Sequence, residues 1–117
     1  MAMSAKQNRH LPAFLLLFLL DGPKHGGALF SLTQESLQLV ESLDSGAVYR
    51  TLRDLEHKLC VKSSWDVEES GPAKRVYSIT EQGLAELQLW QKEMVLRKKN
   101  FEFFLERYQS HFGNDDK

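Results

Sequence analysis

The sequence has one cysteine, three prolines and no apolar run long enough to cross a membrane. Because a disulfide needs two cysteines, Cys60 excludes an internal disulfide framework, which fits the cytoplasm, where we expect the protein. The longest apolar run, Leu11–Leu20, is about half the ~20 residues of a membrane span, and no signal-peptide cleavage site follows it. We therefore expect a buried helix there, and no membrane partner.

The chain also lacks a net charge of either sign, since 15 Lys and Arg face 16 Asp and Glu. A total near zero argues against nucleic-acid binding unless the cations are segregated. Acidic residues collect at 35–44, 66–69 and 81–106, whereas the middle of the chain carries a series of cations: Arg50, Arg53, Lys58, Lys62, Lys74 and Arg75. The local pattern thus leaves a DNA-binding surface open.

The 117 residues are enough for one modest core. We expect helices over 11–20 and 28–40, then an amphipathic helix capped by Asp44 or Ser45, whose apolar residues recur every three or four positions. Two extended runs, 61–67 and 75–79, predict a β-hairpin, and Thr80 then caps a long helix to residue 112. The fold class is mainly α with a small β-hairpin: a winged helix-turn-helix domain (9–80) and a dimerisation helix (81–112).

Large side chains recur along the last helix in steps of three and four, with one arginine among them: Leu87, Trp90, Met94, Arg97, Phe101, Phe104, Tyr108 and His111. A seam of period 3.5 on so long a helix is typical of a coiled coil and predicts a homodimer. The alternative is a helix packed on its own domain, which would show a wider apolar stripe.

DNA contact needs cations for phosphates and a few side chains that reach base edges. Arg50 and Arg53 lie on the outward face of the third helix, and Lys74 and Arg75 lie in the hairpin, where they would meet phosphates. The alternative for the helix is a merely solvated charged face.

Other chemistry has weaker signals. Cys60 with His57 resembles a thiol–imidazole pair, but no third catalytic residue is recognisable, so we expect no enzyme. The four histidines lack metal-ligand spacing, and no nucleotide-binding fingerprint occurs, so we expect neither metal nor cofactor.

Two stretches resemble the PadR family of bacterial transcriptional regulators. SGAVYRTLRDLE (Ser45–Glu56) is similar to the family's G-x-x-Y-x-x-L-x-x-L-E, and GPAKRVYSITEQG (Gly71–Gly83) to its G-P-x-[KR]-[KR]-x-Y-x-[LI]-T-x-x-G. His25-Gly26 matches the His-Gly that opens the second helix, and the resemblance covers about residues 11–112. Gly27 departs from it by replacing an aromatic residue.

The resemblance implies a dimeric winged-helix repressor. Tyr49 would approach the phosphate backbone, and Lys74 and Arg75 would be the wing cations. Ser45 and Ala47, which replace the family's usual proline and its Thr or Ser, complete the expected DNA-contacting set.

The family's effectors are often small aromatic molecules. The seam that would bind such a molecule, or only pack the dimer, consists of aromatic and apolar residues of the first and last helices: Phe14, Phe18, Leu87, Trp90, Met94, Phe101, Phe104 and Tyr108.

We thus predict a homodimeric repressor that binds a palindromic double-stranded DNA operator. The alternative is a winged-helix protein-interaction module without DNA binding, which the near-neutral charge favours.

Overall fold

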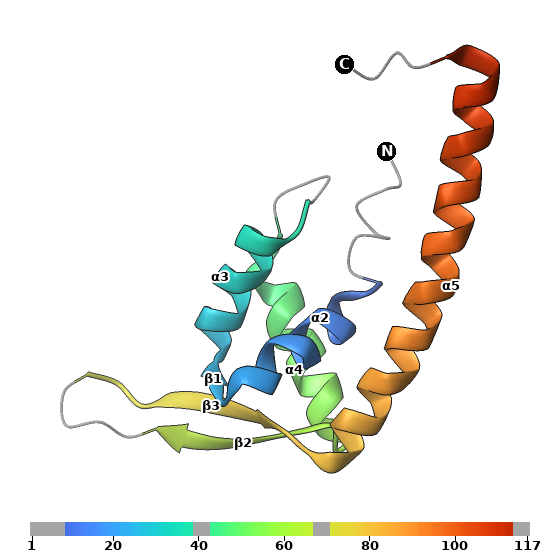
Figure 1. Ribbon diagram of the computed structural model, residues 1–117. Coiled ribbons are helices and arrows are strands. Elements are labelled where there is room, and N and C mark those ends of the chain that lie inside the picture. The colour runs from blue at the N-terminus through green and yellow to red at the C-terminus, as the bar shows by residue number, and fades with distance from the viewer. Residues whose placement is uncertain (1–8, 39–42, 67–70, 114–117) are drawn as a thin grey trace. The chain divides into compact units, whose positions relative to one another are not determined.

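The computed structural model describes residues 9–38, 43–66 and 71–113. The elements follow in the order α2 (Leu11–Phe18), a 3-10 turn η1 (Leu19–Asp21), β1 (Lys24–His25), α3 (Gly26–Ser36), α4 (Ser45–His57), β2 (Val61–Asp66), β3 (Lys74–Ile79) and α5 (Glu81–Phe112) (Figure 1). The chain divides into two compact units, Met1–Leu87 and Gln88–Lys117. The predicted fold class, mainly helical with a small β-hairpin and a long last helix, is confirmed.

The first unit is built on three helices that pack against one another, α2, α3 and α4. Leu15 and Leu16 of α2, Leu29 of α3 and Leu52 of α4 are all fully buried between them. Burying a leucine side chain contributes roughly 1.5–3 kcal/mol, so each member of this cluster stabilises the unit considerably.

Helix α4 is the most amphipathic of these elements because its apolar residues recur on one face. Its N-cap is Asp44, whose carboxylate accepts a hydrogen bond of 3.0 Å from the Gly46 amide. Such a cap contributes about 1 kcal/mol and fixes where the helix begins.

The end of α4 is a Schellman motif with an unusual residue. The Cys60 amide donates to the Leu55 carbonyl at 2.8 Å and the Leu59 amide to the Glu56 carbonyl at 3.0 Å. This places Leu59 at the left-handed position, with φ of 65°, which glycine usually occupies.

The second helix ends earlier than predicted. Helix α3 begins at Gly26 and ends at Ser36, because the backbone of Leu37 is extended (φ −106°, ψ 147°). Residues 39 and 40, which the prediction included, lie outside the described residues, as do residues 67–70 of the predicted hairpin turn.

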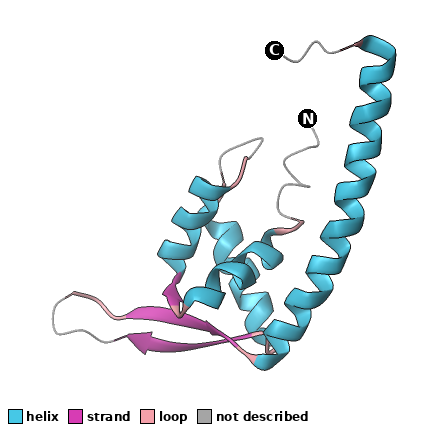
Figure 2. Ribbon diagram, in the orientation of Figure 1, coloured by secondary structure: helices cyan, strands magenta, loops and turns pink. Residues whose placement is uncertain are grey.

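The hairpin is confirmed and gains a third strand. The antiparallel sheet has the order β1-β3-β2, with Trp65 opposite Arg75 and Lys24 opposite Tyr77 (Figure 2). We call β2 and β3 the wing. The two-residue strand β1 joins the wing directly to the first turn of α3.

Helix α5 begins where it was predicted to begin. The Thr80 hydroxyl accepts a hydrogen bond of 3.1 Å from the Gly83 amide, while the Thr80 amide donates to the Cys60 carbonyl at 3.0 Å. The Gln82 side chain donates to the Lys58 carbonyl at 3.0 Å. The first turn of α5 is therefore bonded to the residues that end α4.

Gly83 explains why this turn can approach so closely. A Cβ atom at this position would collide with the Cys60 carbonyl oxygen and would lie 2.7 Å from a side-chain carbon of Ile79. Only glycine fits here.

The second unit is the remainder of α5. Several large apolar side chains on it are exposed, among them Phe101 (61%), Phe104 (64%) and Tyr108. The rings of Phe104 and Tyr108 are stacked with centroids 6.5 Å apart. No helix within the described residues is both long and apolar enough to cross a membrane.

Candidate nucleic-acid interface

The outward face of α4 carries most of the predicted DNA contacts. Ser45, Tyr49, Arg50 and Arg53 are exposed on it, Tyr49 at 43%. Arg50 lies 3.4 Å from the Asp44 carboxylate, an exposed ion pair that holds the guanidinium only weakly.

Ala47 differs from the other predicted contacts. It is only 4% exposed and belongs to the core, as does its neighbour Val48. Its methyl group is therefore not available to a ligand.

Lys74 is an exposed cation of the wing. It is paired with Asp66 in the strand register, but its ammonium forms no hydrogen bond or ion pair with any residue that the structure describes. Its charge is thus free to meet an anion.

Arg75 has a different environment. Its guanidinium donates to the Ser63 hydroxyl at 2.9 Å and lies 4.0 Å from the Glu56 carboxylate. The Ser63 hydroxyl in turn donates to Glu56 at 2.7 Å, and the guanidinium stacks over the Trp65 ring, 4.7 Å from its centroid. Arg75 thus links the wing to α4, and its guanidinium has partners within the protein, unlike the Lys74 ammonium among the described residues.

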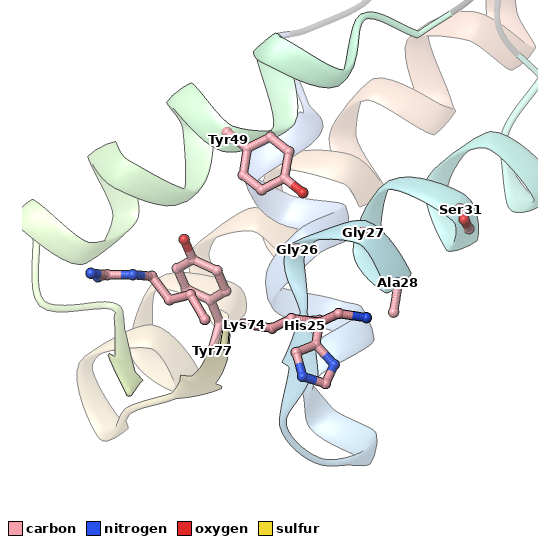
Figure 3. A pocket seen from close by; sticks show the side chains of 9 residues that line it. His25, Gly26, Gly27, Ala28, Ser31, Tyr49, Lys74 and Tyr77 are labelled. Atoms are coloured by element: carbon pink, nitrogen blue, oxygen red, sulfur yellow. The ribbon is translucent and has the colours of Figure 1, made fainter. Parts of the chain in front are cut away.

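A hollow of about 550 Å³ lies between the wing, α4 and the first turn of α3. Figure 3 shows Tyr49 above the start of α3, with Tyr77 and Lys74 on the side of the wing. The lining therefore combines two phenol groups, one ammonium group and the start of a helix.

Gly26 allows this arrangement. A Cβ atom on Gly26 would overlap the Tyr49 ring and lie 3.2 Å from its hydroxyl oxygen. At the edge of the hollow, His25 Nε2 lies 3.1 Å from the Asp66 carboxylate, and this contact connects β1 with β2 across β3.

Tyr77 is the most enclosed group of the hollow. The residue is 7% exposed, and its hydroxyl forms no hydrogen bond with any residue that the structure describes. Burial is the largest of the influences that raise the pKa of Tyr77 above its ordinary value, so the hydroxyl is a proton donor at neutral pH.

The thiol–imidazole pair finds no support. Cys60 is buried, and burial, with a smaller contribution from the Glu86 carboxylate, raises the pKa of the thiol. A buried protonated thiol is a poor nucleophile. Among the described residues, no group of three or more His, Cys, Asp and Glu could hold a metal ion.

The predicted seam residues fall into two groups. Phe14, Phe18 and Leu87 of the first unit are half-buried. In the second unit Trp90 and Met94 are half-buried, whereas the residues further along, Phe101, Phe104 and Tyr108, are exposed.

The family follows from a comparison with known families. Residues 15–89 match the model of the transcriptional regulator PadR-like family. The chain belongs to this family. The resemblance seen in the sequence is thereby confirmed, while a comparison with curated proteins found no match.

Solved structures agree in fold. A PadR family transcription regulator from Clostridium difficile is 24% identical, with a TM-score of 0.72 over 82% of this chain and 98% of that one. A transcriptional regulator from Clostridium thermocellum is 20% identical, with a TM-score of 0.75 over 86% of this chain and 95% of that one. Bacillus subtilis PadR, solved in complex with operator DNA, is 23% identical, with a TM-score of 0.62 over 69% of this chain and 46% of that one.

One part of the surface was not foreseen. Strand β1, which leads into Gly26 and Gly27 of the hollow, was not predicted because two residues cannot show a strand period. The only indication in the sequence was the His25-Gly26 pair.

Proposed function

We propose that this PadR-like regulator is a repressor that binds a palindromic operator as a homodimer, in the cytoplasm. Helix α4 would enter the major groove, where Arg50 and Arg53 reach base edges. Lys74 and Tyr49 would contact the phosphate backbone on either side of the hollow. Ser45, at the start of α4, would donate its hydroxyl to a neighbouring phosphate.

One observation carries this proposal: Tyr49, Arg50, Arg53 and Lys74 are all exposed, although other residues of the same elements form the core. Gly26 leaves room for the Tyr49 ring to lie beside the start of α3, next to this face. The operator complex of Bacillus subtilis PadR supports the same use of the fold. A protein-interaction module without DNA binding is the less favoured function.

The test is a titration of the purified protein with the duplex found upstream of its own gene, since such regulators commonly act on neighbouring genes. We expect saturable binding that weakens steeply with salt, because each neutralised phosphate contributes about 0.9 to the slope of log K against log salt. Arg53→Ala should lower affinity for this duplex more than for a scrambled one. An intact dimer that bound no DNA at low salt would favour the interaction module.

The homodimer is proposed from α5. Phe101, Phe104 and Tyr108 would remain in water on a lone helix, and a second copy of the same seam would cover them. Phe104→Glu should convert the dimer to a monomer in light scattering, whereas Ser110→Glu should not, because residue 110 lies well away from the seam at 100° per residue. A Phe104→Glu variant that stayed dimeric would place the interface elsewhere.

The effector is proposed to be a small aromatic molecule that binds near Trp90 and Met94. It must bind more tightly to the dimer arrangement with low DNA affinity, since only differential binding can shift the equilibrium. A screen of phenolic compounds would follow Trp90 fluorescence, and Trp90→Phe, which leaves Trp65 as the reporter, is the matched control. A signal that persisted in this variant would place the ligand near the wing.

A further inference from the structure

The hollow beside the wing has the features of an oxyanion site. It is lined by Gly26, Gly27 and Ala28, the first turn of the 11-residue helix α3. The first amides of a helix have no partner within it, and their dipoles favour negative charge. No side chain caps this helix and no acidic residue lies in its first turn.

A second, independent observation points to a ligand. Tyr77 is 7% exposed and lines the hollow, and its hydroxyl has no hydrogen-bond partner among the described residues. The ring is enclosed, but the hydroxyl oxygen is not fully buried. It is therefore open to an acceptor that enters the hollow. Because the hydroxyl is protonated, that acceptor can be an anionic oxygen.

The charged groups around the hollow are also compatible with a bound anion. The Lys74 ammonium has no partner among the described residues, whereas the nearby carboxylates of Glu56 and Asp66 face Arg75 and His25 at 4.0 Å and 3.1 Å. The Tyr49 hydroxyl lies at the start of α3 (Figure 3). The hollow thus offers donors from three elements, one of them the Lys74 ammonium.

We propose that this hollow seats one phosphate of the DNA backbone, held by the Tyr77 hydroxyl, the amides of Gly27 and Ala28, and Lys74. The inference rests on the proposed function and deepens it, because it adds a buried donor and the start of α3 to the contacts of α4 and the wing. It also gives the β1–α3 joint a role: β1 is paired with β3, which fixes the helix start beside Tyr77.

The main test is Tyr77→Phe, which keeps the buried ring and removes only the hydroxyl. Since that hydroxyl has no partner in the part of the chain that the structure describes, the thermal midpoint should not fall. Operator affinity should fall roughly tenfold, the effect of losing one hydrogen bond to a charged group. The salt slope should not change, because no charge is removed.

Gly27→Asp is the complementary variant. A Cβ at Gly27 meets nothing within 4 Å, and a carboxylate in the first turn of a helix is stabilising. We therefore expect a folded protein of equal or higher stability whose operator affinity falls by more than tenfold, because the carboxylate occupies the place of the phosphate. The neutral control is Gly27→Asn, which should lose less.

A methylphosphonate scan locates the phosphate. Each duplex carries one neutral linkage, and its affinity is measured with the original protein and with Tyr77→Phe. At the position seated in the hollow, the penalty of the neutral linkage should shrink in Tyr77→Phe, while all other positions keep theirs. Equal penalties at every position in the two proteins would overturn the proposal.

The remaining outcomes distinguish a free phosphate from a phosphate of the DNA, and a failure of this inference from a failure of the proposed function. Inorganic phosphate that shifted the amide resonances of Gly27 and Ala28, with no coupling to any duplex position, would mean a site for a free anion and would overturn the DNA assignment. If the original protein bound no DNA at all, the proposed function would fail and this inference with it. If it bound DNA and Tyr77→Phe bound equally well, only this inference would fail.

Discussion

Lys74 and Arg75 are adjacent cations with the same charge, yet the structure gives them different roles. Lys74 has no partner among the described residues, whereas Arg75 is bonded to Ser63 and faces Glu56. We therefore predict that Lys74→Ala changes DNA binding and leaves stability nearly unchanged, and that Arg75→Ala does the opposite.

The magnitudes follow from the contacts. In a dimer with one phosphate at each wing, Lys74→Ala should reduce the salt slope by ~1.8, because each contact contributes about 0.9. Arg75→Ala removes a hydrogen bond worth about 1 kcal/mol, together with an exposed ion pair and a contact with Trp65 that each contribute less than about 1 kcal/mol. Since such terms are not additive, we expect a loss of about 1–2 kcal/mol in the free energy of unfolding.

The assays are affinity measurements at several salt concentrations and urea unfolding of the same variants. Glu56→Gln is the matched control for Arg75→Ala, because it weakens the same ion pair from the other side. Lys98→Ala controls for net charge, because it removes one cation from α5. If Arg75→Ala lowered the salt slope as much as Lys74→Ala, Arg75 would contact phosphate, and the assignment of Arg75 to the link between wing and α4 would be refuted.

Three further predictions concern the end of α4 and the start of α5. Leu59→Gly should stabilise the protein by about 0.5–1 kcal/mol in urea unfolding. Leu59 is 67% exposed, and its φ of 65° costs a non-glycine residue about 1–2 kcal/mol. A loss of stability would show that packing of the Leu59 side chain outweighs this cost. Gly83→Ala should destabilise the protein by more than about 2 kcal/mol or prevent folding, because its Cβ would collide with the Cys60 carbonyl oxygen, and an unchanged thermal midpoint would contradict this. The Cys60 thiol should react with iodoacetamide much more slowly in the folded than in the unfolded protein, because burial raises its pKa. The same raised pKa stabilises the folded protein fully at neutral pH, and this contribution is lost only as the pH rises through the alkaline range.

Much of the fold could be predicted because its signals are local. The spacing of Val48, Leu52 and Leu55 identifies α4, since one face of a single helix meets a single core. Thr80 marks the start of α5 because a cap involves only residues three positions apart.

The features that were missed depend on distant partners. The end of α3 was placed too late because apolar residues continue beyond Ser36, although the backbone turns at Leu37. The link formed by Arg75 could not be foreseen, because Ser63 and Glu56 reach it only through the pairing of β2 with β3 and the turn that ends α4. A sequence shows which residues are cations but not which of them are already neutralised.

The joint between α4 and α5 constrains how this regulator can change over time. The carbonyls of Lys58, Leu59 and Cys60 all accept hydrogen bonds from Thr80 or Gln82. Two of the three donors are side chains, so the start of α5 is held to the end of α4 by the residue types at positions 80 and 82. Substitutions at this joint are therefore expected to lower stability before they alter any other property, so variation is expected at residues further along α5, while the joint keeps its sequence.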